Sequence, residues 1–117
     1  MADPDRDLVV ASLKKVLELD QDVRRRLRDN EGRVRKAIRE LEKGSTIATA
    51  MEVTKASEGR QSVNEGLDSL ALARHEVRLA ITVASLKEGM SIGDLGRAWG
   101  ISRQLASRYA KEARGGL

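Results

Sequence analysis

The residues whose types and spacing most clearly suggest a binding function lie close together near the C-terminus. On a helix with 3.6 residues per turn, five polar or basic side chains share one face. They are Arg103, Gln104, Ser107, Arg108 and Lys111. In the major groove of double-stranded DNA, Arg can pair with guanine and Gln with adenine, each pair contributing about 1–3 kcal/mol of discrimination. Residues at the helix start reach deepest, so base contacts are predicted for Ser102, Arg103 and Gln104.

The net charge of +4 is concentrated around this face. From Leu95 to Leu117 the chain carries five Lys or Arg against one acidic residue. Cations at these places suit phosphate contacts, which hold a protein on the duplex. The predicted phosphate-binding residues are Arg97, Arg108, Lys111 and Arg114. A second basic cluster, Arg24 to Arg39, is interleaved with acidic residues, which favours charges flanking a helix bundle over a second nucleic-acid surface.

Two short helices are predicted to position these side chains. Ser91 followed by Asp94 is a capping pattern, and it predicts a helix that ends at Trp99. Gly100 then supplies a sharp turn, and Ser102 caps a final helix that reaches about residue 113. The apolar positions expected to anchor the two helices are Ile92, Leu95, Trp99, Ile101, Leu105, Ala106 and Tyr109.

The run "GISRQLASRY" resembles the turn and recognition helix of helix-turn-helix DNA-binding proteins. The resemblance covers roughly residues 74–114, with the helix that ends at Lys87 as the supporting first helix of a trihelical unit. Those families usually carry Ala where this chain has Gly96, and a larger aliphatic residue where it has Ala106. The resemblance implies a sequence-specific DNA-binding protein of the transcriptional-regulator type, with the last helix in the major groove.

The first half of the chain is predicted to be helical from Asp5 to Lys43. Its apolar residues follow the alternating three-and-four spacing of a heptad seam if Asp20, Asn30 and Ala37 are accepted as weak members. The apolar members are Val9, Leu13, Val16, Val23, Leu27, Val34 and Leu41. The segment "DNEG", which ends at Gly32, favours a turn that folds this region into a hairpin. The alternative is a helix that continues through Gly32 at a cost of about 1 kcal/mol relative to Ala.

Gly44 with Ser45 predicts a helix stop. Ser62 and Glu65 then have capping-box spacing, which predicts that a new helix begins at Ser62 and runs to Lys87. A further seam over residues 63–70 lies on this helix. Because a single helix-turn-helix buries little surface on DNA, the two seams are predicted to pair protomers.

Several classes of site are excluded by composition. The chain has no Cys and one His, His75, which excludes disulfides and thiol catalysis and predicts no metal site. No Gly-rich phosphate loop is present, so we expect neither an enzyme nor a cofactor. The first residues lack the pattern of a secretory signal, and no run reaches membrane-spanning length. We therefore expect no membrane partner and a cytoplasmic protein that is nucleoid-associated when bound to DNA.

Together these patterns predict an all-α protein. Residues 1–60 would form a helical dimerisation or oligomerisation region, as a coiled coil or a helix bundle, and residues 61–117 a helix-turn-helix domain. The predicted partners are double-stranded DNA and a second copy of the chain. Two alternatives remain: an architectural or plasmid-segregation protein with weak sequence preference, and a helical adaptor that binds a protein partner.

Overall fold

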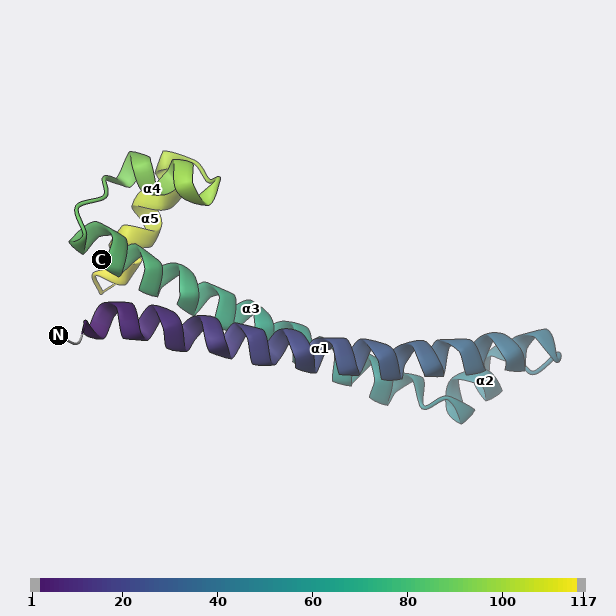
Figure 1. The fold of residues 1–117 in the computed structure, drawn as a ribbon. Helices are drawn as coiled ribbons and strands as arrows, with labels where there is room; N and C mark the ends of the chain where they lie inside the picture. The colour runs from purple at the N-terminus through teal and green to yellow at the C-terminus, as the bar shows by residue number, and fades with distance from the viewer. Residues whose placement is uncertain (1–2, 116–117) are drawn as a thin grey trace. The chain divides into compact units, whose positions relative to one another are not determined.

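The computed structural model describes residues 3–115, and every regular element within that range is a helix (Figure 1). The helices are α1 (Pro4–Glu42), α2 (Ile47–Val53), α3 (Ala56–Lys87), α4 (Ile92–Trp99) and α5 (Arg103–Ala113). This confirms the predicted all-α class. None of the helices in the described range is long and apolar enough to cross a membrane.

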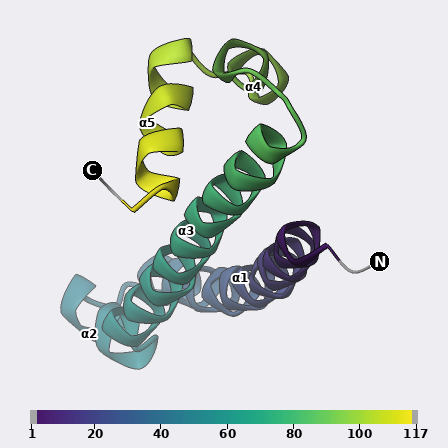
Figure 2. The same ribbon diagram turned by 90° about the vertical axis from the view of Figure 1, so that its left-hand side faces the viewer.

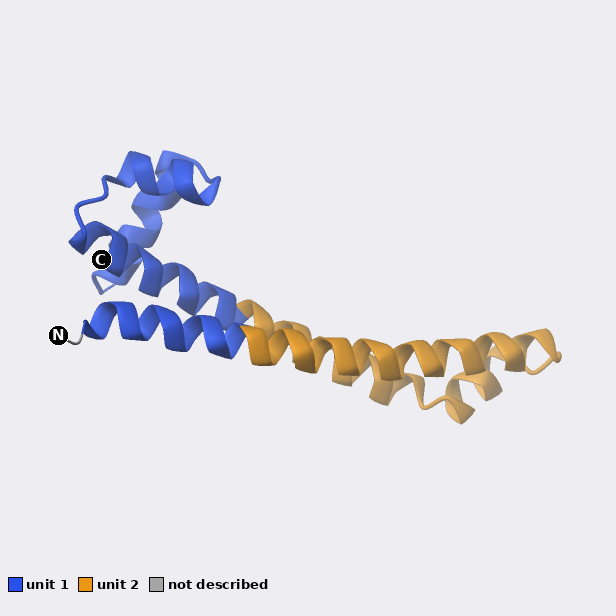
Figure 3. Cartoon of the chain, viewed as in Figure 1, with its two compact units in different colours: residues 1–16, 72–117 blue, residues 17–71 orange. Residues whose placement is uncertain are grey.

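The helices form two compact units (Figure 3). Unit 1 combines the start of the chain, up to Val16, with the segment from Leu72 onward, and unit 2 is Leu17–Ala71. Both α1 and α3 contribute residues to both units. The units are therefore not the consecutive segments 1–60 and 61–117, and the functional division between those two segments stays a prediction.

The predicted break at Gly32 is wrong, because α1 continues from Pro4 to Glu42. Gly32 has no positive φ, and a Cβ built on it would meet open space. Nearby Asn30 is half-buried, with its side-chain oxygen against Gly59 of α3. This packing holds the helix together across a glycine whose intrinsic cost is only about 1 kcal/mol.

The actual stop is at Gly44, as predicted. Gly44 has a φ of 95°, which glycine adopts without steric cost. Its N–H donates to the Leu41 carbonyl at 3.0 Å, and the Ser45 N–H donates to the Glu40 carbonyl at 3.1 Å. These two bonds form the Schellman arrangement that satisfies carbonyls at a helix C-terminus.

In unit 2, arginine stems rather than leucines fill much of the contact between α1 and α3. A Cβ on Gly66 would lie 2.7 Å from the Arg26 Cδ, and one on Gly59 would lie 2.8 Å from the Arg33 Cδ. The Arg26 Nη1 donates to the Ser62 carbonyl at 2.8 Å, and the Arg33 Nη1 donates to the Thr54 carbonyl at 2.8 Å. The two helices thus run antiparallel, with arginines on one facing glycines on the other.

The predicted seam on α1 is therefore correct only in part. Val23 is buried against α3, and Val9 and Val16 are half-buried. Four other predicted members remain between 40% and 50% exposed. They are Leu13, Leu27, Val34 and Leu41. At two of these positions the preceding residue is the half-buried one: Arg26 instead of Leu27, and Arg33 instead of Val34. A hydrophobic pattern counts arginine as polar, but these two arginines bury their aliphatic stems against α3.

The predicted start of a helix at Ser62 is also wrong, since α3 begins at Ala56. The Ser62 hydroxyl accepts from the Arg26 Nη1 at 3.2 Å. The Glu65 carboxylate accepts from the Gln61 side chain at 3.2 Å. The spacing that suggested a capping box instead belongs to a helix interior whose polar groups have other partners.

Unit 1 packs the C-terminal part of α3 against α5, as Figure 2 shows. Its core consists mainly of small side chains, which allow helix backbones to approach closely. The buried members are Ala73, Val77, Ala80, Thr82, Ala84, Leu95, Ala106 and Ala110. At the other side of α3, Lys87 Nζ donates to the Asp5 carboxylate at 2.8 Å. This hydrogen bond, together with the charge of Asp5, raises the pKa of Lys87 above its ordinary value.

Candidate nucleic-acid interface

The predicted turn between two short helices is present in detail. The Ser91 hydroxyl accepts from the Asp94 N–H at 3.1 Å and caps α4, which ends at Trp99 as expected. Gly100 adopts a left-handed conformation with φ 75°. The Ile101 N–H then donates to the Gly96 carbonyl at 2.9 Å. Cap, helix end and turn glycine are all confirmed at the residues that the sequence indicated.

The last helix also begins and ends where the sequence predicts. The Ser102 hydroxyl accepts from the Leu105 N–H at 3.1 Å and caps α5. The helix continues to Ala113. This capping bond fixes the direction of the first turn, because it satisfies a backbone donor that would otherwise be free.

The close approach of α4 to the turn explains one departure from the usual helix-turn-helix pattern. A Cβ on Gly96 would lie 3.1 Å from the Ile101 carbonyl oxygen and 3.5 Å from the Ser102 carbonyl oxygen. These are backbone atoms, so they could yield only if the turn itself moved. On the α5 side, Ala106 and Ala110 are both 0% exposed. Small residues at both places allow the two helices to pack tightly.

Some of the expected anchors lie further out than predicted. Leu105 and Tyr109 are only half-buried, and the centre of the contact is formed by Ala106 and Ala110. Trp99 is 37% exposed, so it lies at the edge of the core. The fully buried residues of α5 are thus two alanines rather than Leu105 and Tyr109.

All eight predicted DNA-binding residues have exposed side chains. At 100° per residue, the five within α5 span an arc of about 140°. The buried Ala106 and Ala110 lie outside this arc, beyond its Arg103 edge. The eight exposed residues are Arg97, Ser102, Arg103, Gln104, Ser107, Arg108, Lys111 and Arg114. Six of them thus lie at the Ser102 cap and within α5, Arg114 directly follows the end of α5, and Arg97 is on α4.

The basic side chains differ in whether they already have a partner. Arg97 forms an ion pair with Asp94 on the same helix. Hydrogen bonds from the Ser91 hydroxyl and from Arg97 lower the pKa of the Asp94 carboxyl below its ordinary value. By contrast, no carboxylate in residues 3–115 lies within 4.0 Å of the charged groups of four cations. These are Arg103, Arg108, Lys111 and Arg114.

A polar and aromatic contact that sequence reasoning missed holds α5 on α3. The His75 Nε2 lies 2.7 Å from the Glu112 Oε1. The rings of His75 and Tyr109 meet edge to face, with centroids 6.1 Å apart, and the Arg78 guanidinium lies 5.9 Å from the Tyr109 centroid. Glu112, the one acidic residue of α5, is therefore paired with α3 and not with the cations of the basic face. Its spacing gave no signal, because the contact joins residues 37 positions apart.

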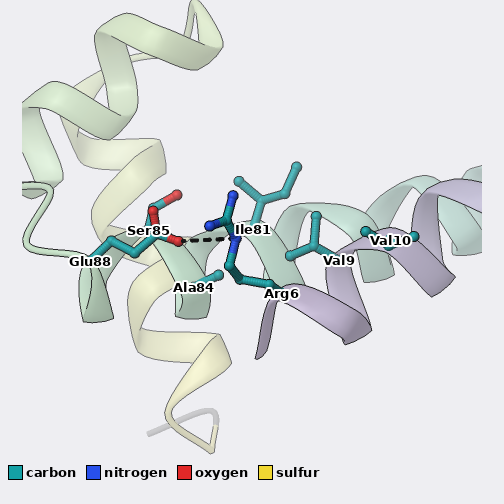
Figure 4. Close-up of a pocket in the computed structure, with 7 residues that line it drawn as sticks. All are labelled: Arg6, Val9, Val10, Ile81, Ala84, Ser85 and Glu88. Carbon is teal, nitrogen blue, oxygen red and sulfur yellow. Dashed lines mark ion pairs between the residues drawn. The ribbon is translucent and has the colours of Figure 1, made fainter. Parts of the chain in front are cut away.

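The cavity in unit 1 shown in Figure 4 offers a different kind of surface. It has a volume of about 230 Å³ between the first turns of α1 and the end of α3. Val9, Ile81 and Ala84 contribute its apolar wall, and Arg6 pairs with Glu88 across its rim at 3.8 Å. Both members of this pair are largely exposed, so the pair contributes little to stability. Within the described range no group of three His, Cys, Asp or Glu residues could hold a metal ion.

Comparisons with known proteins give no functional assignment, which therefore rests on the residues described above. No protein family, curated protein or solved structure matches the chain.

Proposed function

We propose that this protein binds double-stranded DNA sequence-specifically as a homodimer, with α5 in the major groove, and acts as a transcriptional regulator. The observation that carries the proposal is the division of α5 into two faces. One face is buried through Ala106 and Ala110, and the other presents exposed cations without carboxylate partners among residues 3–115. A helix with one basic, hydrogen-bonding face suits the groove, whose width admits a single α-helix.

The roles within this face follow from position along the helix. Ser102, Arg103 and Gln104 stand at the N-terminal end of α5, which enters a groove first, so they are assigned to base edges. Arg108, Lys111 and Arg114 follow towards the C-terminal end and are assigned to phosphates. Arg97 contributes a phosphate contact from α4 once it exchanges Asp94 for the DNA backbone.

A dimer follows from the small size of this surface. One helix-turn-helix reads a short half-site, and two of them placed about 34 Å apart read a symmetric operator. The charged and apolar faces of α1 and α3 leave ample surface for pairing, since Leu13, Leu27 and Leu67 are all more than 40% exposed.

The test is a charge reversal. Arg103→Glu with Arg108→Glu is compared with the parent for binding to a labelled duplex pool by fluorescence anisotropy. The matched control, Lys15→Glu with Arg39→Glu, makes the same change in net charge at two exposed positions of α1. We expect the first variant to lose DNA binding and the control to retain it.

Other outcomes would identify the alternatives. Equal loss in both variants, with steep salt dependence and no preference among sequences, would indicate an architectural DNA-coating protein. Absence of DNA binding by the parent would contradict the proposal and favour an adaptor that uses the Ile101 and Leu105 side of the hairpin.

A further inference from the structure

A cavity within unit 1 lies between the end of α3 and the end of α5. Its volume is about 590 Å³, whereas two neighbouring cavities of unit 1 have volumes of about 230 and 330 Å³. Sites for small organic molecules typically measure about 300–1,000 Å³. Six residues line the cavity: Val83, Leu86, Lys87, Ala110, Ala113 and Arg114. We call it the α3–α5 cavity, and its size suits a small ligand.

The wall of the α3–α5 cavity is apolar. On one edge of the contact between α5 and α3, the Tyr109 ring packs edge to face. On the next edge α5 offers only the methyl groups of Ala110 and Ala113, and α3 supplies Val83 and Leu86. Val83, Leu86 and Ala113 are only half-buried. These side chains therefore leave apolar surface that a ligand could cover.

The charges around the α3–α5 cavity are of one sign. Its lining contains Lys87 and Arg114 and no acidic residue. Both cations are exposed, so they stand at the open edge of the cavity. The two neighbouring cavities differ, since one includes Glu88 and the other includes Glu76 and Glu112. An apolar wall with cations at its edge suits an apolar molecule that carries an anionic group.

The partners of the two cations indicate a single negative charge. Lys87 Nζ already donates to the Asp5 carboxylate at 2.8 Å. Arg114 has no carboxylate within 4.0 Å among residues 3–115. One free guanidinium matches one carboxylate, which it can bind through two parallel hydrogen bonds. A phosphate monoester would bring about two negative charges at neutral pH, which is more than this edge can balance.

We propose that the α3–α5 cavity binds a small apolar molecule with a single carboxylate. Its apolar part lies against Val83 and Leu86, and its carboxylate lies on Arg114. An ammonium group has three N–H donors, so Lys87 can add a contact at the same edge while it keeps Asp5. This binding does not require DNA.

One consequence of the ligand site rests on the proposed function. Arg114 is assigned there to a DNA phosphate, so the ligand and the duplex compete for the same guanidinium. The ligand therefore weakens DNA binding.

Octanoate is the probe, and octanamide is its neutral counterpart of the same shape. Methyl NMR spectra of the full chain should show saturable shifts for Val83, Leu86 and Ala113 when octanoate is added. Calorimetry should give octanoate a Kd about tenfold lower than that of octanamide, as expected for a hydrogen bond between charged groups. Equal affinity for the two compounds would overturn the proposal. Equal shifts of Leu17 and Leu27, which are exposed on α1, would overturn it too.

Two variants locate the carboxylate and the apolar part. Arg114→Gln should raise the octanoate Kd about tenfold and leave the octanamide Kd unchanged. The matched control Arg39→Gln, at an exposed position of α1, should change neither. Ala113→Leu should fill the cavity and abolish binding of both compounds, with circular dichroism to check that the helices remain. An octanoate Kd that Arg114→Gln leaves unchanged would contradict the proposal.

A DNA titration separates this proposal from the proposed function. Octanoate should raise the Kd of the parent for a labelled duplex, but not that of Ala113→Leu. A parent that binds octanoate at the lining methyls but binds no DNA would remove only the proposed function. A parent that binds DNA but shows no octanoate shifts would remove only the ligand site.

Discussion

Replacing single arginines on α5 should separate phosphate contacts from base contacts by their salt dependence. Four cations per chain are assigned to phosphates: Arg97, Arg108, Lys111 and Arg114. With about eight such contacts in a dimer, the slope of log K against log salt should be about −7. Arg108→Ala removes two contacts and should flatten the slope by about 1.8. Between 50 and 200 mM salt, affinity should then fall by about three orders of magnitude rather than about four.

Arg103→Ala should behave differently because Arg103 is assigned to a base edge. We expect the slope to stay unchanged, while affinity for the selected operator falls by about 1–3 kcal/mol per half-site. Affinity for random duplex should fall far less. The absolute slope of the parent depends on whether Arg97 leaves Asp94 to contact a phosphate. The difference in slope between the parent and Arg108→Ala does not, so this difference is the better test.

Fluorescence anisotropy with a labelled operator and a labelled random duplex measures both effects. Arg39→Ala, an exposed arginine of α1, serves as the matched control and should leave both the slope and the discrimination unchanged. A parental slope for Arg108→Ala would contradict the assignment of Arg108 to phosphates. Equal weakening of operator and random DNA by Arg103→Ala would contradict the assignment of Arg103 to a base edge.

Three further predictions concern the fold and are read from urea unfolding. Gly32→Ala should raise the free energy of unfolding by about 1 kcal/mol, because Gly32 lies within a helix and faces open space. A lower free energy of unfolding would instead favour the turn that the sequence predicted at Gly32. Gly66→Ala should lower stability in the parent, where its Cβ would collide with the Arg26 stem, but raise it by about 1 kcal/mol in an Arg26→Ala background; additive effects would contradict this contact. A hydrogen bond from Arg26, with a further one from Arg25, lowers the pKa of the Asp22 carboxyl. The stabilisation from the ionised Asp22 is therefore complete above its ordinary pKa and is lost as the pH falls below about 4. Asp22→Asn should therefore reduce the loss of stability over that acid range, and an unchanged profile would show that this carboxylate contributes nothing.

The α4–turn–α5 region could be predicted almost residue by residue because its signals are local. Ser91, Gly100 and Ser102 each act on a backbone group within three or four positions of their own, so their spacing is sufficient. The exposure of the basic face followed from helix periodicity. The position of Trp99 at the edge of the core could not be predicted, because its exposure depends on three-dimensional packing rather than on local spacing.

The first half of the chain could be predicted only in outline, because its contacts join distant residues. Gly32 and Gly44 are the same residue type after a polar run, yet only Gly44 ends a helix. What distinguishes them is packing against α3, where Asn30 lies against Gly59. The contact of Arg26 with Gly66 could not be predicted either, because arginine is usually expected at the surface and glycine is not expected at a helix contact. The pattern of a single helix carries no information about which residue on another helix it meets.

The proposed function requires that α5 reads a specific, symmetric DNA sequence. The most direct measurement is to incubate the purified protein with fragmented genomic DNA at near-physiological salt, recover the bound fragments and sequence them. A parallel sample with Arg103→Ala and Arg108→Ala serves as the control. We expect enrichment of a two-fold symmetric motif that the control loses. Uniform recovery that disappears only with added salt, or no recovery at all, would contradict it.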